Sequence, residues 1–444
     1  MNLKALFAVL ALLGLSVSGV ARADDHTVNV VRVVSPGGIE AWLVRDHINP
    51  IINMHIAFRG GAALDPVGKA GLAHMVSALL DEGAGDMDSQ SFQRRLEDLS
   101  VELRFNAERD TFSGRLKTLS ENKDQAFELF KAALIKPRFD DGPVERMRGQ
   151  ILAGLRRDSE DPDTVAGQAL ARELFPNHPY GRPVEGTQES IATITIDDLR
   201  EFTRQRLARD NLMIAVVGDI DGEELARRLD EIFANLPAVS KPVNVQDIQP
   251  QSAGRIKVVE MAIPQSAIAF AQKGLKRDDP DFYTGYVLNH ILGGGGFTSR
   301  LYEEIREKRG LAYSIGSYLY PLRHAGLVQG YGGTANARVG ETLEVLKNQW
   351  REMAETGASA TELLDAKTYL IGSYPLRFTS TDGIASILVS MQLENLGIDY
   401  LDRRNKMIEG VSLEAVNKLA KSLLDPDNLV VVVVGTPDGV VSTP

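Results

Sequence analysis

Short apolar runs open the first part of the chain, and longer segments with helical spacing follow them. Strands are predicted at residues 28–34, 39–45, 51–58, 101–107 and 111–116. Helices are predicted at residues 68–80, 89–99, 122–135 and 143–158, where apolar positions recur at helical spacing. Pro143 suits the first turn of the last of these helices.

The second part of the chain repeats this order. Strands are predicted at residues 255–261 and 267–272, followed by helices at residues 279–292 and 298–308. Strands followed by helices within one unit predict an α+β fold, in which helices pack on a mostly antiparallel sheet.

An internal repeat divides the chain in two. The tripeptide Asp-Asn-Leu at residues 210–212 recurs at 427–429, and each copy leads into a β-branched run that ends at glycine. Upstream, the start of a helix at 194–199 matches residues 411–416 in the same register. Three prolines and polar residues in 237–254 are typical of a linker. The sequence therefore predicts two homologous domains, residues 24–236 and 255–444, joined by that linker.

Composition excludes several classes of site. The 444 residues include seven histidines and no cysteine, which excludes disulfides, thiolate zinc sites, iron–sulfur clusters and cysteine nucleophiles. With 49 basic and 60 acidic side chains the net charge is −11, so a nucleic-acid partner is not expected.

The first 23 residues have the pattern of a secretory signal. Lys4 precedes an apolar stretch at residues 5–15, and small residues lead to Ala21-Arg22-Ala23. We therefore predict a signal peptide at 1–23, export to a bacterial periplasm, and no membrane span afterwards. The alternative is that the segment stays attached as a membrane anchor.

Several motifs together resemble the pitrilysin/insulinase family of peptidases, whose zinc motif is H-x-x-E-H. They are Gly-Gly-Ala-Ala-Leu-Asp at 60–65, Lys-Ala-Gly-Leu-Ala-His at 69–74, His-Pro-Tyr-Gly-Arg-Pro at 178–183, Ser-Arg-Leu at 299–301 and the segment 306–313. The resemblance implies two homologous α+β halves that face each other across a chamber enclosing unfolded peptides.

The zinc motif itself is degenerate. Positions i, i+3 and i+4 share one face of a helix, and in this chain they are His74, Ser77 and Ala78. The resemblance places the third zinc ligand after Glu-Arg-Met-Arg at 145–148, on Gly154. Catalytic zinc usually takes three protein ligands, and here one of three remains. We therefore predict that this chain holds no metal and that His74 is a hydrogen-bonded remnant.

The second half keeps a different part of the family's site. The resemblance implies an Arg and a Tyr seven residues later that hold the substrate near the scissile bond and support the oxyanion, and Arg306 and Tyr313 match this pair. Arg offers a planar fork of donors, and Tyr offers a phenolic donor. The glycines at 293–296 follow a predicted helix and lack a P-loop lysine, so they are interpreted as a hinge or a chamber-lining loop.

Some members of the family that this chain resembles are heterodimers in which one chain carries zinc and the other completes the site, and this sequence is similar to the non-zinc chain of such a pair. A homologous partner would carry zinc, this chain would supply Arg306 and Tyr313, and the substrates would be peptides or unfolded segments that add a strand to a sheet edge. Two alternatives stay open: an autonomous zinc endopeptidase with unusual ligands, and a non-catalytic structural or peptide-binding subunit.

Overall fold

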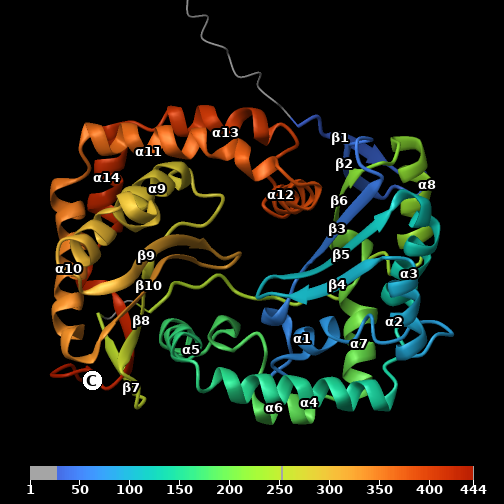
Figure 1. Cartoon of the computed structure of the whole chain (residues 1–444), viewed down its shortest axis with the longest axis horizontal. Helices are drawn as coiled ribbons and strands as arrows, with labels where there is room; N and C mark the ends of the chain where they lie inside the picture. The colour runs from blue at the N-terminus through green and yellow to red at the C-terminus, as the bar shows by residue number, and fades with distance from the viewer. Residues whose placement is uncertain (1–27, 252–253, 444) are drawn as a thin grey trace, which may run out of the picture.

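The structure, a computed structural model, describes residues 28–251 and 254–443 and consists of two halves that face each other (Figure 1). One half is built on a six-stranded sheet and the other on a five-stranded sheet. The predicted signal peptide at 1–23 lies outside the described residues. Among the residues described, no helix is long and apolar enough to cross a membrane.

The sheet of the first half has the strand order β1-β2-β6-β3-β5-β4. Its strands are β1 (Val31–Val34), β2 (Glu40–Arg45), β3 (Ile51–Arg59), β4 (Glu102–Ala107), β5 (Thr111–Leu119) and β6 (Leu212–Gly218). Only the β2–β6 pair is parallel. The helices of this half are α1 (Leu72–Ser77), α2 (Ser89–Asp98), α3 (Lys123–Ile135), α4 (Asp141–Asp158), α6 (Gln188–Thr193), α7 (Ile196–Arg206) and α8 (Gly222–Phe233). A continuous apolar core joins these helices to the sheet.

The sheet of the second half has the order β7-β11-β8-β10-β9. Its strands are β7 (Ile256–Glu260), β8 (Gln265–Lys273), β9 (Ala312–Pro321), β10 (Gly326–Ala335) and β11 (Val430–Gly435). Its helices are α9 (Phe282–Asn289), α10 (Val339–Thr356), α11 (Ala360–Gly372), α13 (Tyr400–Glu409) and α14 (Leu413–Leu423). Again one pair, β7–β11, is parallel and the other pairs are antiparallel.

The two halves share one topology, and the predicted fold class is confirmed. In each half the repeated segment forms a helix followed by an inner strand, α7 with β6 and α14 with β11. Each of these strands is parallel to one neighbour and antiparallel to the other. Their β-branched residues are almost all buried because both faces of the strand are covered.

Three helices differ from the predicted ones. Gly68 and Gly71 take φ values of +82° and +90°, so α1 begins only at Leu72 instead of residue 68. The helix predicted at 279–292 becomes a π-helix over His290–Gly294, and the one predicted at 298–308 is π-helical over Tyr302–Glu307. A π-helix forms its backbone hydrogen bonds between residues five apart, whereas an α-helix forms them between residues four apart. The spacing of apolar residues does not distinguish the two, so the π-helical segments were not predicted.

The halves exchange one helix each. The helix α5 (Pro162–Leu174) of the first half packs on β8 and β11 of the second sheet, and α12 (Thr381–Leu393) of the second half packs on β3 and β6 of the first. Each exchanged helix completes an apolar cluster with the sheet that it covers. In Figure 1, α5 and α12 both lie toward the middle of the molecule.

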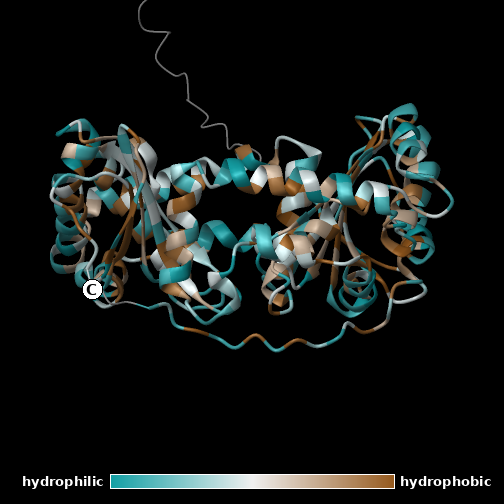
Figure 2. Cartoon of the chain, turned by 90° about the horizontal axis from the view of Figure 1, so that it is seen from below, coloured by the Kyte–Doolittle hydropathy of each residue, from teal (hydrophilic) through white to brown (hydrophobic). Residues whose placement is uncertain are grey.

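The connection between the halves runs along one side of the molecule (Figure 2). Residues 238–251 form no helix or strand, but they are tied down at several points. Near its start, Ser240 N–H donates to Asp210 in the first half, and further on Ile248 N–H donates to the carbonyl of His324 in the second. His178 Nε2 lies 3.0 Å from the carbonyl of Gln246 and donates to it. The segment therefore contacts both halves along its length.

Arg59 joins the halves at the end of α12. From β3 its guanidinium donates to the carbonyls of Gln392 and Leu393, at 3.0 and 2.8 Å, and to the side chain of Asn395. These carbonyls lie at the C-terminal end of the helix, which carries the negative end of its dipole.

We expect Arg59→Ala to lower the free energy of unfolding by about 1–3 kcal/mol, because charged hydrogen bonds to the end of α12 are lost. Urea denaturation followed by circular dichroism measures the change. Arg94→Ala is the control, since Arg94 is exposed on α2. Equal stability of the two variants would contradict a role for Arg59 in holding α12.

Candidate functional site

The degenerate zinc helix α1 is firmly positioned. The carboxylate of Asp65 accepts hydrogen bonds from the backbone N–H groups of Gly71 and Ala73, at 2.9 and 3.1 Å, and so caps the start of the helix. Burial raises the pKa of Asp65 to about 7, despite these hydrogen bonds and the nearby Arg182. The start of α1 is therefore held in place by the Asp65 side chain.

Four positions make up the degenerate zinc site. His74 and Ser77 lie on α1, Ala78 directly follows its last residue, and Gly154 lies on α4, which packs against α1. Burial lowers the pKa of His74 and so favours the neutral form of its imidazole. The hydroxyl of Ser77 donates to the carbonyl of His74 at 2.8 Å and is already used inside the helix. Ala78 has no donor atom, and a Cβ added to Gly154 would come near only the guanidinium of Arg157, at 3.8 Å.

These residues do not fit a zinc ion. Catalytic zinc needs about three protein ligands around one point, and His74 alone offers a suitable atom. Across residues 28–251 and 254–443, no group of three or more His, Asp or Glu side chains could hold a metal.

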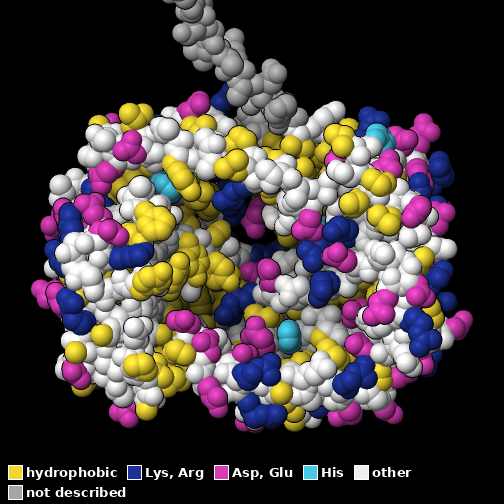
Figure 3. Space-filling view, viewed as in Figure 1, with side chains coloured by type: hydrophobic (Ala, Val, Ile, Leu, Met, Phe, Trp, Pro, Cys, Tyr) yellow, Lys and Arg dark blue, Asp and Glu magenta, His cyan; other side chains and the backbone are white. Residues whose placement is uncertain are grey.

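Arg306 and Tyr313 come together in the second half. The guanidinium carbon of Arg306 lies 4.7 Å from the ring centroid of Tyr313 and 4.7 Å from that of Tyr302. Phe297 is a third ring, at 5.9 Å. Tyr313 is 81% exposed and Phe297 is 78% exposed, so the group presents aromatic surface and a cation to solvent. Figure 3 shows hydrophobic side chains gathered on the inner side of this half.

Phe297 and Tyr302 belong to this group but were not predicted from the sequence. Tyr302 stands four residues before Arg306, a spacing that places two side chains on one helix face and was available as a signal. Phe297 follows the glycines and is placed by the turn after them, which no periodicity predicts.

The glycine segment is more closely packed than a hinge. A Cβ on Gly293 would lie 2.9 Å from the backbone nitrogen of Ser317, so only glycine fits against β9 there. The side chain of Asn289 donates to the carbonyl of Ser317 at 3.1 Å. Gly293 is therefore packed tightly against β9 and is not a flexible hinge, while the other interpretation of residues 293–296, a loop that lines the chamber, stays a prediction.

Arg300 fixes the segment that carries Arg306. Its guanidinium donates to the carboxylate of Glu362 at 2.6 and 2.9 Å and to the carbonyl of Gly357 at 2.8 Å. This hydrogen bond lowers the pKa of Glu362 to about 2. The Ser-Arg-Leu motif thus ties the turn after the glycines to the start of α11.

We expect Glu362→Gln to lower the free energy of unfolding by about 1–3 kcal/mol at pH 7, because the charged pair with Arg300 is broken. The folded-state pKa lies below the usual 4.5, so this stability is present above pH 4.5 and is lost as the pH falls toward 2. Denaturation curves at pH 7 and pH 3 test this. Exposed Glu355→Gln is the control, and a difference between Glu362→Gln and wild type that stays the same at both pH values would contradict the assignment.

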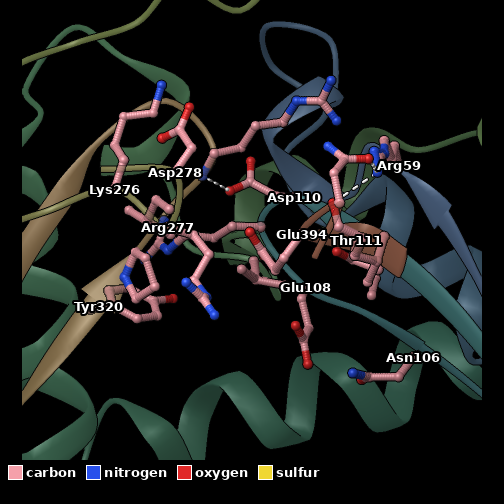
Figure 4. Close-up of a pocket in the computed structure, with 18 of the residues that line it drawn as sticks. Arg59, Asn106, Glu108, Asp110, Thr111, Lys276, Arg277, Asp278, Tyr320 and Glu394 are labelled. Carbon is pink, nitrogen blue, oxygen red and sulfur yellow. Dashed lines mark hydrogen bonds between the residues drawn. The ribbon is translucent and has the colours of Figure 1, made fainter. Parts of the chain in front are cut away.

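A cavity of about 670 Å³ lies between the two halves (Figure 4). Its walls carry equal numbers of basic and acidic residues. These are Arg59, Arg109, Lys276, Arg277 and Arg323, with Glu108, Asp110, Glu185, Asp278 and Glu394. Opposite charges are interspersed, so the cavity offers many polar contacts without favouring one sign of ligand.

Two family models match the chain side by side. One, described as insulinase (peptidase family M16), matches residues 42–188, and the other, described as peptidase M16 inactive domain, matches residues 193–370. The chain belongs to the M16 (insulinase) peptidase family. The resemblance to this family is confirmed. The two homologous α+β halves of this M16 protein agree with the fold that the resemblance implies.

The relatives of this M16 chain carry contrasting names. It is 28% identical over 431 residues to a Helicobacter pylori protein named non-peptidase homolog YmxG, covering 96% of this chain and 98% of that one. It is 26% identical to a Streptomyces coelicolor protein named an uncharacterized zinc protease, covering 80% and 78%. A crystal structure of a peptidase M16 inactive domain from Pseudomonas fluorescens is 29% identical, with a TM-score of 0.86 over 94% of this chain and 99% of that one.

Proposed function

We propose that this chain is the non-zinc subunit of an M16-type metallopeptidase in the periplasm. A homologous partner would carry the zinc ion and the general base, and this chain would contribute Arg306, Tyr313 and half of the wall around the substrate. The observation that carries the proposal is the contrast between the two halves: the zinc positions lack a ligand set, whereas Arg306 and an exposed Tyr313 lie together.

The chemistry assigned to this chain needs no metal of its own. Arg306 cannot lose its proton, and its donors would hold a carbonyl of the substrate next to the scissile bond. The hydroxyl of Tyr313 would donate to the oxygen that becomes negative in the transition state. The rings of Tyr302 and Phe297 restrict the guanidinium of Arg306, so less freedom is lost when substrate binds.

The substrates would be peptides or unfolded segments in extended form. Strand β4 is at the edge of its sheet and pairs only with β5 among the described strands, so its outer edge can accept another strand. By contrast, Asn289 and Gly293 close part of the edge of β9. We therefore expect the peptide to add to β4.

The Helicobacter pylori relative is named a non-peptidase homolog, and this name supports a second candidate, a subunit that makes no contribution to cleavage. Such a subunit would bind peptides without acting on them. The two functions differ in one outcome: a catalytic contribution requires that cleavage by the complex depends on Arg306 and Tyr313, and a binding subunit does not.

The decisive experiment compares the purified chain alone with the same chain and a homologous zinc-motif protein from the same organism. We expect zinc and peptide cleavage only when both are present, with zinc at about one ion per pair, as a single catalytic site requires. Stoichiometric zinc and cleavage in the isolated chain would instead establish an autonomous peptidase. N-terminal sequencing of the periplasmic fraction, expected to start at Asp24, tests the location.

A further inference from the structure

A second cavity, of about 410 Å³, lies in the second half between the start of α9, the exchanged helix α12 and the start of α13. Its lining joins three arginines, Arg277, Arg377 and Arg404, to four tyrosines and one phenylalanine. Glu394 is the only acidic residue among the described residues that line it, and burial raises the pKa of its carboxyl group despite the nearby Arg277. The cavity therefore has an excess of positive charge and aromatic walls.

Arg404 is the most deeply buried of these cations, with 5% of its surface exposed. Its guanidinium lies 3.7 Å from the ring centroid of Tyr374 and donates to the carbonyl of Leu370 and to Asn405. In the described part of the chain, no carboxylate lies within 4.0 Å of its nitrogens. A buried cation without a carboxylate is costly, and an anionic ligand in the cavity would compensate its charge.

Arg277 is held in place by aromatic groups. Its guanidinium lies 4.2 Å from the ring centroid of Phe282 and donates to the hydroxyls of Tyr283 and Tyr400 at 2.9 and 3.2 Å. Arg377 is exposed and, within residues 28–251 and 254–443, also forms no ion pair. Fixed donors next to flat rings are suited to a carboxylate attached to an aromatic or large apolar group.

We propose that this pocket binds the C-terminal residue of a peptide, with the carboxylate at the arginines and an aromatic or large apolar side chain against the tyrosines. The volume is in the range of pockets for small ligands and suits one or two residues. Helix α9 begins at the pocket with Tyr283, and along the chain it is followed by the glycine segment that precedes Phe297 and Arg306. Its eight residues span about 12 Å from the pocket to that segment, a length that about four residues cover in extended form.

The choice of a peptide over a small carboxylic acid as the ligand rests on the proposed function. One substrate peptide would place its C-terminal residue in the pocket and extend to Arg306 and Tyr313. With the C-terminal residue in the pocket, the scissile bond would lie a fixed, short distance from the free C-terminus of the peptide. Peptides with a free carboxylate would be preferred over internal segments of longer chains.

The test is calorimetric titration of the whole chain, without a partner, with N-acetyl-Ala-Ala-Ala-Phe as the free acid and as the C-terminal amide. We expect the acid to bind at least about tenfold more tightly than the amide, because only the acid offers a charge to the arginines. N-acetyl-phenylalanine and inorganic phosphate are the other probes. Equal affinity for acid and amide, or for the peptide and N-acetyl-phenylalanine, would overturn the proposal.

Variants locate the binding. Arg404→Met and Arg377→Ala are each expected to weaken the acid about tenfold and to leave the weak binding of the amide unchanged. Because Arg377 is exposed, its variant keeps the test valid if the buried Arg404 variant does not fold. Arg204→Ala, exposed on α7 of the other half, is the matched control. Retained affinity in the Arg377 variant and in any folded Arg404 variant would place the site elsewhere.

The outcome is independent of the proposed catalytic role. Binding is measured without zinc and without cleavage, so a chain that binds the acid but never supports a peptidase would refute the function and leave the pocket. Cleavage by the complex with no preference for peptides that have a free carboxylate would refute the role of the pocket and leave the proposed function standing.

Discussion

Replacing Arg306 with alanine is expected to lower kcat/KM of the proposed two-subunit peptidase about 100- to 1000-fold, the usual loss when one transition-state donor is removed. The zinc content should not change, because Arg306 is on the chain that holds no zinc ligand set. Its guanidinium and the phenol of Tyr313 form one group, with 4.7 Å between the guanidinium carbon and the ring centroid. Tyr313→Phe should therefore lose a similar part of the rate, and the double variant should lose little more.

Two controls separate this role from a structural one. Arg309→Ala changes an arginine on the same segment that instead pairs with Glu304, and it should cleave at the normal rate. Arg306→Lys keeps the charge without the planar fork, and it should recover only a small part of the activity. Unaltered turnover in Arg306→Ala, with the complex intact, would move the assignment to a peptide-binding or structural subunit.

The duplicated fold was predictable because its signals are local and occur twice. The helix and β-branched strand at 194–218 recur 217 residues later, and both strands occupy an inner position of their sheet. The exchange of α5 and α12 was not predictable from such signals. Ala166, Ala169 and Leu170 on α5 are apolar at helical spacing, but the spacing does not say which sheet they cover.

The candidate site could be predicted only in part. The degenerate zinc motif could be recognised from the residue types at positions 74, 77 and 78 alone, because the ability to bind a metal depends on residue type. The pairing of Arg306 with Tyr313 came from a resemblance, and the structure adds its geometry. The arginine pocket had no sequence signal, because Arg277 and Arg404 lie 127 positions apart and meet only through the packing of α9, α12 and α13.

The helix exchange leads to a prediction with a large effect on stability: neither half should fold when produced alone. Without α12, the face of the first sheet that is turned toward the other half would expose Trp42, Val44, Ala57 and Val217, which are 9% exposed or less in the whole chain. Burial of four such side chains is worth on the order of 5–10 kcal/mol, comparable with the whole stability of a domain. We expect residues 24–236 alone to aggregate or to lack a cooperative unfolding transition.

The matched control keeps every helix and cuts only the chain. A protease site inserted between Pro242 and Gln246, in the connection without helix or strand, should yield two fragments that elute together on size exclusion and unfold near the temperature of the uncut protein. Since α5 and α12 cross in opposite directions, each fragment completes the core of the other. A soluble, cooperatively folded first half without α12 would contradict this, and the exchanged helices would then be docked elements and not part of the folding unit.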